Sequence, residues 1–376
     1  MSIDTATERN ESTEVTEQTD AIEQTDATFD LARVEAFALK VAGDQAAGSN
    51  AVQVYLGDRL GIWSALASVP ATTSTGLADR TGLSERYLRE WLSAQAAAGY
   101  LTYEPDTQTF ALPAEHAAVL ADDSSPAAMI GGFEVTAGVW AGVERLAHAF
   151  ATGEGIGWHE QDPRVFTGVE RFFRPLYSSS LLADWLPAVD GLVDRLREGA
   201  RVIDVGCGLG TPTLMMAQAF PASEFVGVDY HRASIERATY AAERAGVQNV
   251  SFEVATAADL GSGYDVVCFF DALHDMGDPA GALREAKAAL TPGGLVFAVE
   301  PGAGDHLEDN LHVLGVAWYA ASTALCLPGS LSQEGHLGLG AQAGATRTLE
   351  VFAQAGFGRA RVVAQTPFNL VYEARA

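Results

Sequence analysis

A glycine-rich turn follows a short apolar segment in the second half of the chain. The segment Val202–Val205 contains one acid, Asp204, and runs directly into a turn with glycine at Gly206, Gly208 and Gly210. Glycine lets a backbone turn sharply and approach a ligand where any Cβ would clash. This spacing after an apolar strand predicts a turn that binds a nucleotide-like cofactor.

A second acid, Asp229, ends the next apolar segment, Phe225–Val228. A carboxylate about 20 residues after the glycine turn is placed to accept two ribose hydroxyls. Dinucleotides and S-adenosylmethionine both fit such a site. Asp204 would repel a phosphate but suits an ammonium group, directly or through water, and S-adenosylmethionine carries one. The residues therefore favour S-adenosylmethionine, with an NAD-linked oxidoreductase as the rival that would require NAD binding.

The elements that must position these residues alternate between apolar strands and helices, which is typical of an open α/β sheet. A Pro292–Gly294 turn precedes the fifth expected strand, Leu295–Glu300. The further strands that we expect are Val250–Val254, Tyr264–Phe270, Leu295–Glu300, Ala360–Ala364 and Asn369–Ala374, with a helix at Thr348–Gly356.

Together, the glycine turn, the Pro-Gly-Gly turn and the closing strands resemble the class I S-adenosylmethionine-dependent methyltransferases, over roughly Leu192–Ala376. The resemblance implies a Rossmann-like seven-stranded domain. It implies that Asp204 and the three glycines of the turn meet the methionine end of the cofactor, and Asp271 is a further candidate for that end. It also implies ribose contact for Asp229 and adenine contacts for Tyr230, Thr256 and Ala257, although many relatives have Gly-Asp-Ala where this chain has Ala255-Thr256-Ala257.

A sulfonium methyl group is already electrophilic, so the protein must align an acceptor and remove its proton where it has one. His274, in a Leu-His-Asp sequence common in the family, is the first candidate base, and Glu300, ending the fifth strand, could orient it or a substrate hydroxyl. The plant-type base position holds Ala280, so His274 also fits a structural role, and an already ionised acceptor needs no base. No metal site is predicted, because Cys207, Cys268 and Cys326 lack metal-ligand spacing and fit reduced core thiols.

The N-terminal half predicts a winged helix: a helix, a turn, a second helix capped by Ser84, and a hairpin of Gly99–Tyr103 with Thr109–Leu112. Such folds often bind DNA, but the formal net charge of −26 offers no basic footprint for phosphates. The whole chain from about residue 35 resembles a bacterial subgroup that joins a winged helix to a class I methyltransferase domain. That resemblance implies a homodimer formed through the N-terminal domain.

Four segments are expected: a disordered acidic tail at 1–28, a winged-helix domain at 29–125, a helical connector at 126–196 and a cofactor-binding domain at 197–376. An insertion near 305–340 should form a substrate lid, with His312, Trp318 and Tyr319 as candidate lining residues. The aromatic connector should form the opposite wall, where Arg171 or Arg174 could meet a carboxylate. No secretion signal or long apolar run is visible, which predicts a cytoplasmic protein without membrane partners.

The combined interpretation is methyl transfer from S-adenosylmethionine to a small, largely apolar molecule, at oxygen. One alternative is an S-adenosylmethionine-binding enzyme of a natural-product pathway with non-methylating chemistry. The other is a cofactor-sensing winged-helix regulator, which would retain DNA at physiological salt.

Overall fold

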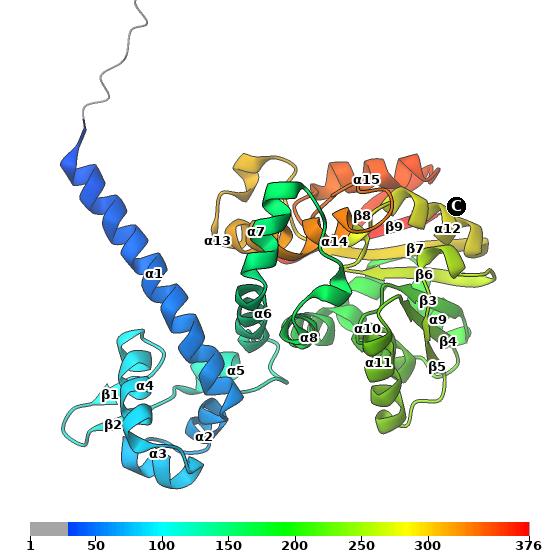
Figure 1. The fold of residues 1–376 in the computed structure, drawn as a ribbon. Coiled ribbons are helices and arrows are strands. Elements are labelled where there is room, and N and C mark those ends of the chain that lie inside the picture. Colours follow the sequence, from blue (N-terminus) through cyan, green and yellow to red (C-terminus); the bar gives the residue numbers. More distant parts are fainter. Residues whose placement is uncertain (1–28, 376) are drawn as a thin grey trace, which may run out of the picture. The chain divides into compact units, whose positions relative to one another are not determined.

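The computed structural model describes residues 29–375, so the acidic tail expected at 1–28 lies outside the described residues. The chain divides into two units, Met1–Ala47 and Gly48–Ala376. The long helix α1 (Leu31–Arg59) begins in the first unit and ends in the second (Figure 1).

The second unit begins with the predicted winged helix. Thr73 caps α3 through its side chain, which accepts from the backbone of Gly76, whereas Ser84 occupies the N-cap of α4 without a side-chain capping bond. The core of this domain contains an edge-to-face pair, Trp63 and Trp91, with ring centroids 4.7 Å apart. The elements after α1 are α2 (Ile62–Ala67), α3 (Ser74–Thr81), α4 (Glu85–Ala97), the antiparallel pair β1 (Thr102–Glu104) and β2 (Thr109–Ala111), and α5 (Ala114–Leu120).

The connector is helical, as predicted, and its helices α6 and α8 pack against each other closely. A Cβ at Gly131 of α6 would lie 2.5 Å from the backbone nitrogen of Phe172, so only glycine permits this approach. The end of α8 continues into a π-helical segment, a form that is frequent at functional sites. The connector consists of α6 (Ile130–Ala141), α7 (Val143–Thr152), α8 (Pro163–Leu176) and the π-helical Tyr177–Trp185.

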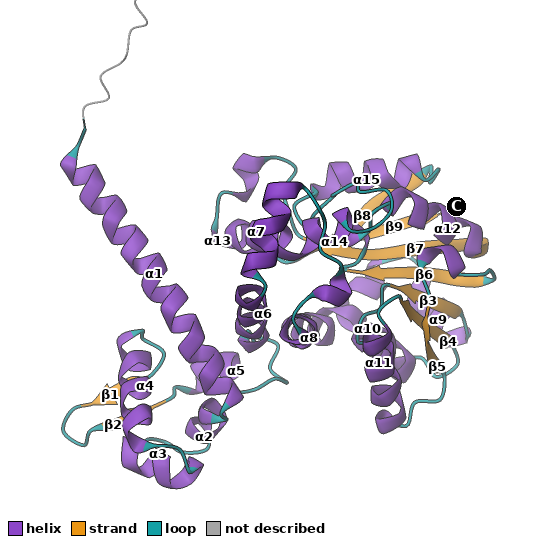
Figure 2. Cartoon of the chain, viewed as in Figure 1, coloured by secondary structure: helices purple, strands orange, loops and turns teal. Residues whose placement is uncertain are grey.

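A seven-stranded sheet forms the C-terminal domain, in the order β5-β4-β3-β6-β7-β9-β8 (Figure 2). All neighbours are parallel except the two pairs made by β9, which is antiparallel to β7 and β8. The chain reverses its direction of winding between β3 and β6, and ligands bind at such a point outside the carboxyl ends of the strands. The strands are β3 (Arg201–Val205), β4 (Glu224–Asp229), β5 (Val250–Val254), β6 (Tyr264–Phe270), β7 (Leu290–Pro301), β8 (Arg359–Gln365) and β9 (Asn369–Arg375).

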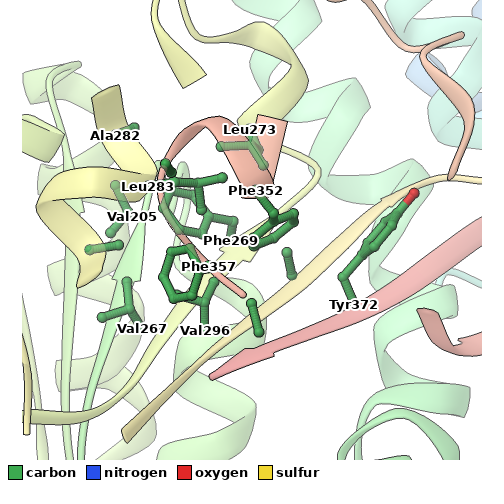
Figure 3. Packing of buried hydrophobic residues seen from close by; sticks show 14 of the residues in the cluster. Val205, Val267, Phe269, Leu273, Ala282, Leu283, Val296, Phe352, Phe357 and Tyr372 are labelled. Atoms are coloured by element: carbon green, nitrogen blue, oxygen red, sulfur yellow. The ribbon is translucent and has the colours of Figure 1, made fainter. Parts of the chain in front are cut away.

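Helices cover both faces of this sheet (Figure 2), and the inner strands are largely buried, whereas the edge strands β5 and β8 are partly exposed. Figure 3 shows Phe269 and Val296 of neighbouring strands packed with Leu283 and Phe352 from the helices of one face. All four of these side chains are fully buried. The helices of this domain are α9 (Leu192–Glu198), α10 (Thr211–Ala219), α11 (Arg232–Ala245), α12 (Pro279–Ala289) and α15 (Gly344–Gln354), together with α13 (Val313–Ala321) and α14 (Leu327–Leu331) of the insertion.

The predicted Rossmann-like sheet and the winged helix are therefore confirmed. The Pro292–Gly294 turn lies within the span of β7, where Gly293 adopts a φ of 80°. The expected insertion is mostly helical. Its run Val313–Leu331 has the length and hydropathy of a membrane span by composition alone, but it contributes Trp318 and Cys326 to the wall of an internal cavity.

Candidate active site

A cavity of about 920 Å³ opens at the carboxyl ends of β3, β4 and β6. The glycine turn forms part of its wall: Gly206 and Gly208 both adopt positive φ, 74° and 52°, which residues with a Cβ rarely do. A Cβ built on Gly208 would meet no protein atom within 4 Å, so open space lies beside its backbone. The turn thus leaves room for a ligand, as predicted from its glycines.

Gly210 has a different task. It does not line the cavity, and a Cβ there would lie 2.5 Å from the ring of Phe252 in β5. Gly210 is the N-cap residue of helix α10, where its backbone adopts a φ of 75°. Gly210 therefore allows helix and strand to pack closely, and direct cofactor contact at this position stays a prediction.

Asp229 lies at the end of β4 and lines the cavity. Its two carboxylate oxygens accept hydrogen bonds from the backbone nitrogens of Gly208, at 3.0 Å, and His231, at 2.8 Å. These bonds favour the ionised form, but burial outweighs them and raises the pKa of Asp229. The carboxylate is thereby fixed at the cavity wall, and its contact with a ribose stays a prediction.

Asp204 lies behind the cavity wall rather than in it. It is fully buried, the Thr213 hydroxyl donates to one carboxylate oxygen, and Oδ1 has no hydrogen-bond partner. Burial raises the pKa of Asp204 to about 7. The predicted direct contact with an ammonium group is not possible in this geometry because the carboxyl is covered, so only the contact through water stays open.

Asp271 follows β6 with a φ of 49°, an uncommon backbone conformation for any residue other than glycine. The Tyr177 hydroxyl donates to Oδ2 at 2.9 Å, and the Asn369 amide donates to Oδ1 at 3.3 Å. Burial raises the pKa of Asp271 to about 8, and the nearby Glu300 adds to this effect. The Asp271 carboxyl lines the cavity, where its ionised form can stabilise a positive charge.

His274 and Glu300 form a buried pair. The ring nitrogen Nδ1 lies 2.5 Å from Glu300 Oε2, and Glu300 also accepts from the backbone nitrogens of Leu273 and His274. Burial by itself lowers the pKa of His274, but the facing carboxylates of Asp275 and Glu300 outweigh it and raise that pKa well above its usual value. His274 lines the cavity and Glu300 does not, so Glu300 orients the histidine.

This protonation bears on the two candidate roles of His274. A histidine that keeps its proton is a poor base, so the geometry supports the structural role more strongly. The base role stays a prediction.

The opposite wall of the cavity is apolar and aromatic. Phe173 and Trp318 stack with ring centroids 6.3 Å apart and an angle of 10° between their planes. The indole Nε1 of Trp318 is buried and has no hydrogen-bond partner. A ligand with an acceptor atom could satisfy this donor, since an unpaired buried donor costs about 1–3 kcal/mol.

The remaining predicted residues divide into two groups. Tyr230, Thr256 and Ala257 line the cavity, as the adenine assignment requires, although the Thr256 hydroxyl donates to Asp259 at 2.8 Å. Several others lie outside the lining: His312 caps α13, Tyr319 is partly exposed, Arg171 pairs with Asp58, Asp123 and Glu134, and Arg174 pairs with Glu170.

The cavity favours cations. Among the described residues that line it, Arg284 is the only arginine or lysine, and it pairs with Asp278 at 3.1 Å. The acids of the same lining are Glu170, Asp229, Asp271, Asp275, Asp278 and Glu285. This surplus of carboxylates disfavours a pyrophosphate and stabilises a cationic ligand.

Sequence reasoning missed two residues of the site, Asp275 and Cys326. Asp275 Oδ1 lies 3.1 Å from His274 Nε2 but lacks hydrogen-bond geometry. Cys326 comes from the insertion, 52 positions after His274. Only the position of Asp275 beside His274 could have suggested it, and no sequence signal joins Cys326 to either residue.

Two family models match the chain. Residues 196–335 match a methyltransferase domain, and residues 48–122 match the Rv2258c-like winged HTH domain. The chain therefore carries an N-terminal winged helix-turn-helix domain followed by a methyltransferase domain, and the predicted combination is confirmed.

Relatives with assigned names align over part of the chain. It is 38% identical over 103 residues to the 27-O-demethylrifamycin SV methyltransferase of Amycolatopsis mediterranei, covering 26% of this chain and 38% of that protein. It is 33% identical over 130 residues to the ubiquinone biosynthesis O-methyltransferase of Ralstonia nicotianae, covering 33% of this chain and 51% of that protein. The chain thus spans between about two fifths and one half of these relatives.

Solved structures match nearly the whole chain. The mitomycin 7-O-methyltransferase MmcR has a TM-score of 0.67 at 20% identity and covers 92% of this chain and 100% of its own. Human N-acetylserotonin methyltransferase in complex with S-adenosylmethionine has a TM-score of 0.65 at 17% identity, covering 93% and 99%. The fold is that of these methyltransferases.

Proposed function

We propose that this protein is an S-adenosylmethionine-dependent O-methyltransferase that acts on a small, largely apolar molecule. The observation that carries the proposal is the division of one cavity into a glycine- and carboxylate-lined end and an aromatic end. The first end suits a cationic nucleoside, and the second suits an apolar acceptor. The methyltransferase family match and the named O-methyltransferase relatives support the reaction type.

The residues at the carboxylate end fit this cofactor. Open space beside Gly208 admits a ligand against the backbone, and the buried Asp204 Oδ1 lacks a partner that a bound water can supply. Asp229 holds the ribose hydroxyls and Asp271 faces the positively charged methionine end. Tyr230, Thr256 and Ala257 flank the adenine. When bound, the cofactor supplies an electrophilic methyl group.

Methyl transfer then requires mainly that the acceptor oxygen be aligned with the methyl group of the cofactor. The aromatic wall excludes water and holds the acceptor oxygen near the carboxylate end. Glu300 fixes the His274 ring, so His274 either anchors the turn at Leu273–Asp275 or, once its proton is lost, accepts the acceptor's proton. His274→Gln, which keeps the volume but cannot take up a proton, separates these roles: loss of the rise of the rate with increasing pH indicates the base.

Calorimetric titration with S-adenosylmethionine and S-adenosylhomocysteine tests the cofactor assignment. We expect micromolar binding by the intact protein and loss of about 30-fold or more in Asp229→Asn, because a charged partner of two hydroxyls is removed. Arg86→Ala, on the exposed surface of α4, is the control. If the intact protein binds neither compound, the proposal fails. Binding justifies a screen of phenols, hydroxy acids and apolar carboxylates for methyl transfer.

The two alternatives gain no support from the comparisons. A non-methylating enzyme would bind the cofactor without turnover of any acceptor. A regulator would bind DNA, yet in α4, the helix expected to read it, Arg86 and Arg89 are both paired with glutamates.

We further propose a cytoplasmic homodimer formed through the N-terminal region. Apolar side chains of the first unit's helix are exposed, among them Phe37, at 66%, and Leu39, at 75%. Contact with a second copy would cover them. Light scattering tests this: a dimer that becomes monomeric in a Phe37→Glu/Leu39→Glu variant supports it, and a monomeric intact protein contradicts it.

A further inference from the structure

We propose that His274, Asp275 and Cys326 form a binding site for one Zn²⁺ ion at the wall of the cavity. Their ligand atoms all lie within 4.8 Å of one another. Imidazole, carboxylate and thiolate are all established zinc ligands, and thiolate selects zinc over magnesium or calcium. The three residues come from two separate segments, the turn Leu273–Asp275 and the π-helical Ser322–Cys326.

Glu300 orients the His274 ring as a carboxylate orients a metal-binding histidine. Glu300 Oε2 lies 2.5 Å from Nδ1, which leaves Nε2 facing Asp275 and Cys326. A carboxylate on the far nitrogen is the usual outer partner of a zinc-bound histidine, because it fixes the ring and raises its basicity.

Asp275 has an unused ligand atom. Its Oδ1 is buried and makes no hydrogen bond, although it lies 3.1 Å from His274 Nε2. The Gln333 amide donates to the backbone carbonyl of Asp275 at 2.8 Å. The Ser330 hydroxyl donates to the next backbone carbonyl, that of Met276, also at 2.8 Å. The turn is therefore fixed by its backbone while one side-chain oxygen stays available for a cation.

All three residues line the cavity, so an ion there keeps a position open toward the ligand space. Three protein ligands with one open position is the arrangement of catalytic zinc, whereas structural zinc has four. Thiolate and neutral imidazole are the binding forms, so the thiol proton and any imidazolium proton pass to solvent when the ion binds.

The site stands without the proposed function, but its role rests on it. An acceptor hydroxyl bound at the open position would lose its proton readily to solvent, since a zinc-bound oxygen is far more acidic than a free one. This would supply the deprotonation that methyl transfer to a hydroxyl requires.

Cobalt provides the direct test. Tag-free, full-length protein is stripped with a chelator and titrated with Co²⁺, which reports thiolate ligation by a charge-transfer absorption band in the near ultraviolet. We expect the band to saturate at one equivalent and to disappear on addition of Zn²⁺. Absence of the band in the intact protein overturns the proposal without any variant.

Variants then locate the ion. Cys326→Ser should remove the band and weaken zinc binding about 100-fold or more, since losing a ligand exceeds the roughly 10- to 100-fold cost of losing an outer partner. Glu300→Gln should keep the band and weaken binding about tenfold. Cys268→Ala, which removes another buried thiol within β6, should change neither. A band that survives in Cys326→Ser overturns the assignment.

Two further controls separate a folding defect, and a failure of the proposed function, from a failure of the zinc site. If Cys326→Ser fails to fold, Asp275→Asn replaces it, and zinc binding as tight as that of the intact protein overturns the proposal. S-adenosylmethionine titration of the same samples distinguishes the two proposals: cofactor binding without metal binding refutes only the zinc site, and metal binding without cofactor binding refutes only the proposed function.

Discussion

The two ends of the cavity are built in different ways. The carboxylate end, with Gly208, Asp229 and Asp271, is built at the carboxyl ends of three neighbouring strands. The aromatic end, with Phe173 and Trp318, joins the connector to the insertion, which are 145 positions apart at this contact. Backbone shape and charge define the first end, and long-range packing defines the second. We therefore expect changes at the two ends to affect different ligands.

The largest effect is expected from Gly208→Ala. The new methyl group meets no protein atom, so the free energy of unfolding should fall by only about 1–2 kcal/mol for the positive φ, while S-adenosylmethionine affinity falls about 100-fold or more. Gly210→Ala is the matched comparison. Its methyl group would lie 2.5 Å from the Phe252 ring, so it should lose more stability than Gly208→Ala. Denaturant unfolding and calorimetry measure both, and equal loss of stability in the two would contradict the distinction.

The next effect is a pH dependence at the carboxylate end. A cation beside Asp271 needs the ionised carboxylate, whose pKa is raised to about 8 in the free protein. Binding of S-adenosylmethionine must therefore release a proton below that pH, and its affinity should rise by up to about tenfold per pH unit toward pH 8 and then level off. S-adenosylhomocysteine lacks the sulfonium charge and should respond less. Asp271→Asn should abolish the difference; an unchanged slope in this variant would assign the effect to another group.

The same shift has a consequence for stability. Between about pH 4 and pH 8 the folded chain keeps a proton on Asp271 that the unfolded chain has lost. Asp204, with a pKa of about 7, acts in the same direction. The free energy of unfolding contributed by both groups therefore falls as the pH rises through this window. A bound cation should reduce this loss.

The sequence predicts where the residues of the carboxylate end lie, because they are close together along the chain. Apolar strands followed by Gly206, Gly208 and Asp229 place all three at the cavity wall within about 30 residues, and nucleotide binding there stays a prediction. Burial is harder to infer: Asp204 looks like a ligand group in the sequence, but it is fully buried and accepts a hydrogen bond from the Thr213 hydroxyl. The pairing of Cys326 with His274 depends on how the insertion packs, and no local pattern records that.

At the aromatic end, Trp318→Phe should have a moderate effect. The ring stack with Phe173 is retained, but the unpaired Nε1 donor is lost. For any acceptor found in the screen we expect KM to rise about tenfold, the cost of one hydrogen bond, with unchanged cofactor affinity. Tyr319→Phe, at the neighbouring partly exposed position, is the control and should leave KM unchanged. A weaker affinity for S-adenosylmethionine in Trp318→Phe would show that the two ends are coupled.

The smallest effect is expected from disrupting the ion pairs of Arg171, which help to hold the aromatic end in place. Arg171 of α8 lies 2.7 Å from Asp58, 3.0 Å from Glu134 and 2.9 Å from Asp123, and its side chain is only 21% exposed. These contacts tie the helix that carries Phe173 to the winged-helix domain and to α6. Arg171→Met leaves three carboxylates facing one another, so we expect unfolding to become easier by about 1–3 kcal/mol.

Its functional readout distinguishes a positioning role from a purely structural one. Loosening α8 should raise the KM for the acceptor about threefold, while S-adenosylmethionine affinity, set by the strand ends, stays unchanged. Arg171→Lys restores one charge without the forked geometry and should recover part of the loss. If KM rises and cofactor affinity falls, both in proportion to the loss of stability, Arg171 serves the whole fold. If KM changes alone, the winged-helix domain helps to shape the acceptor pocket, and the aromatic end depends on contacts far beyond its own walls.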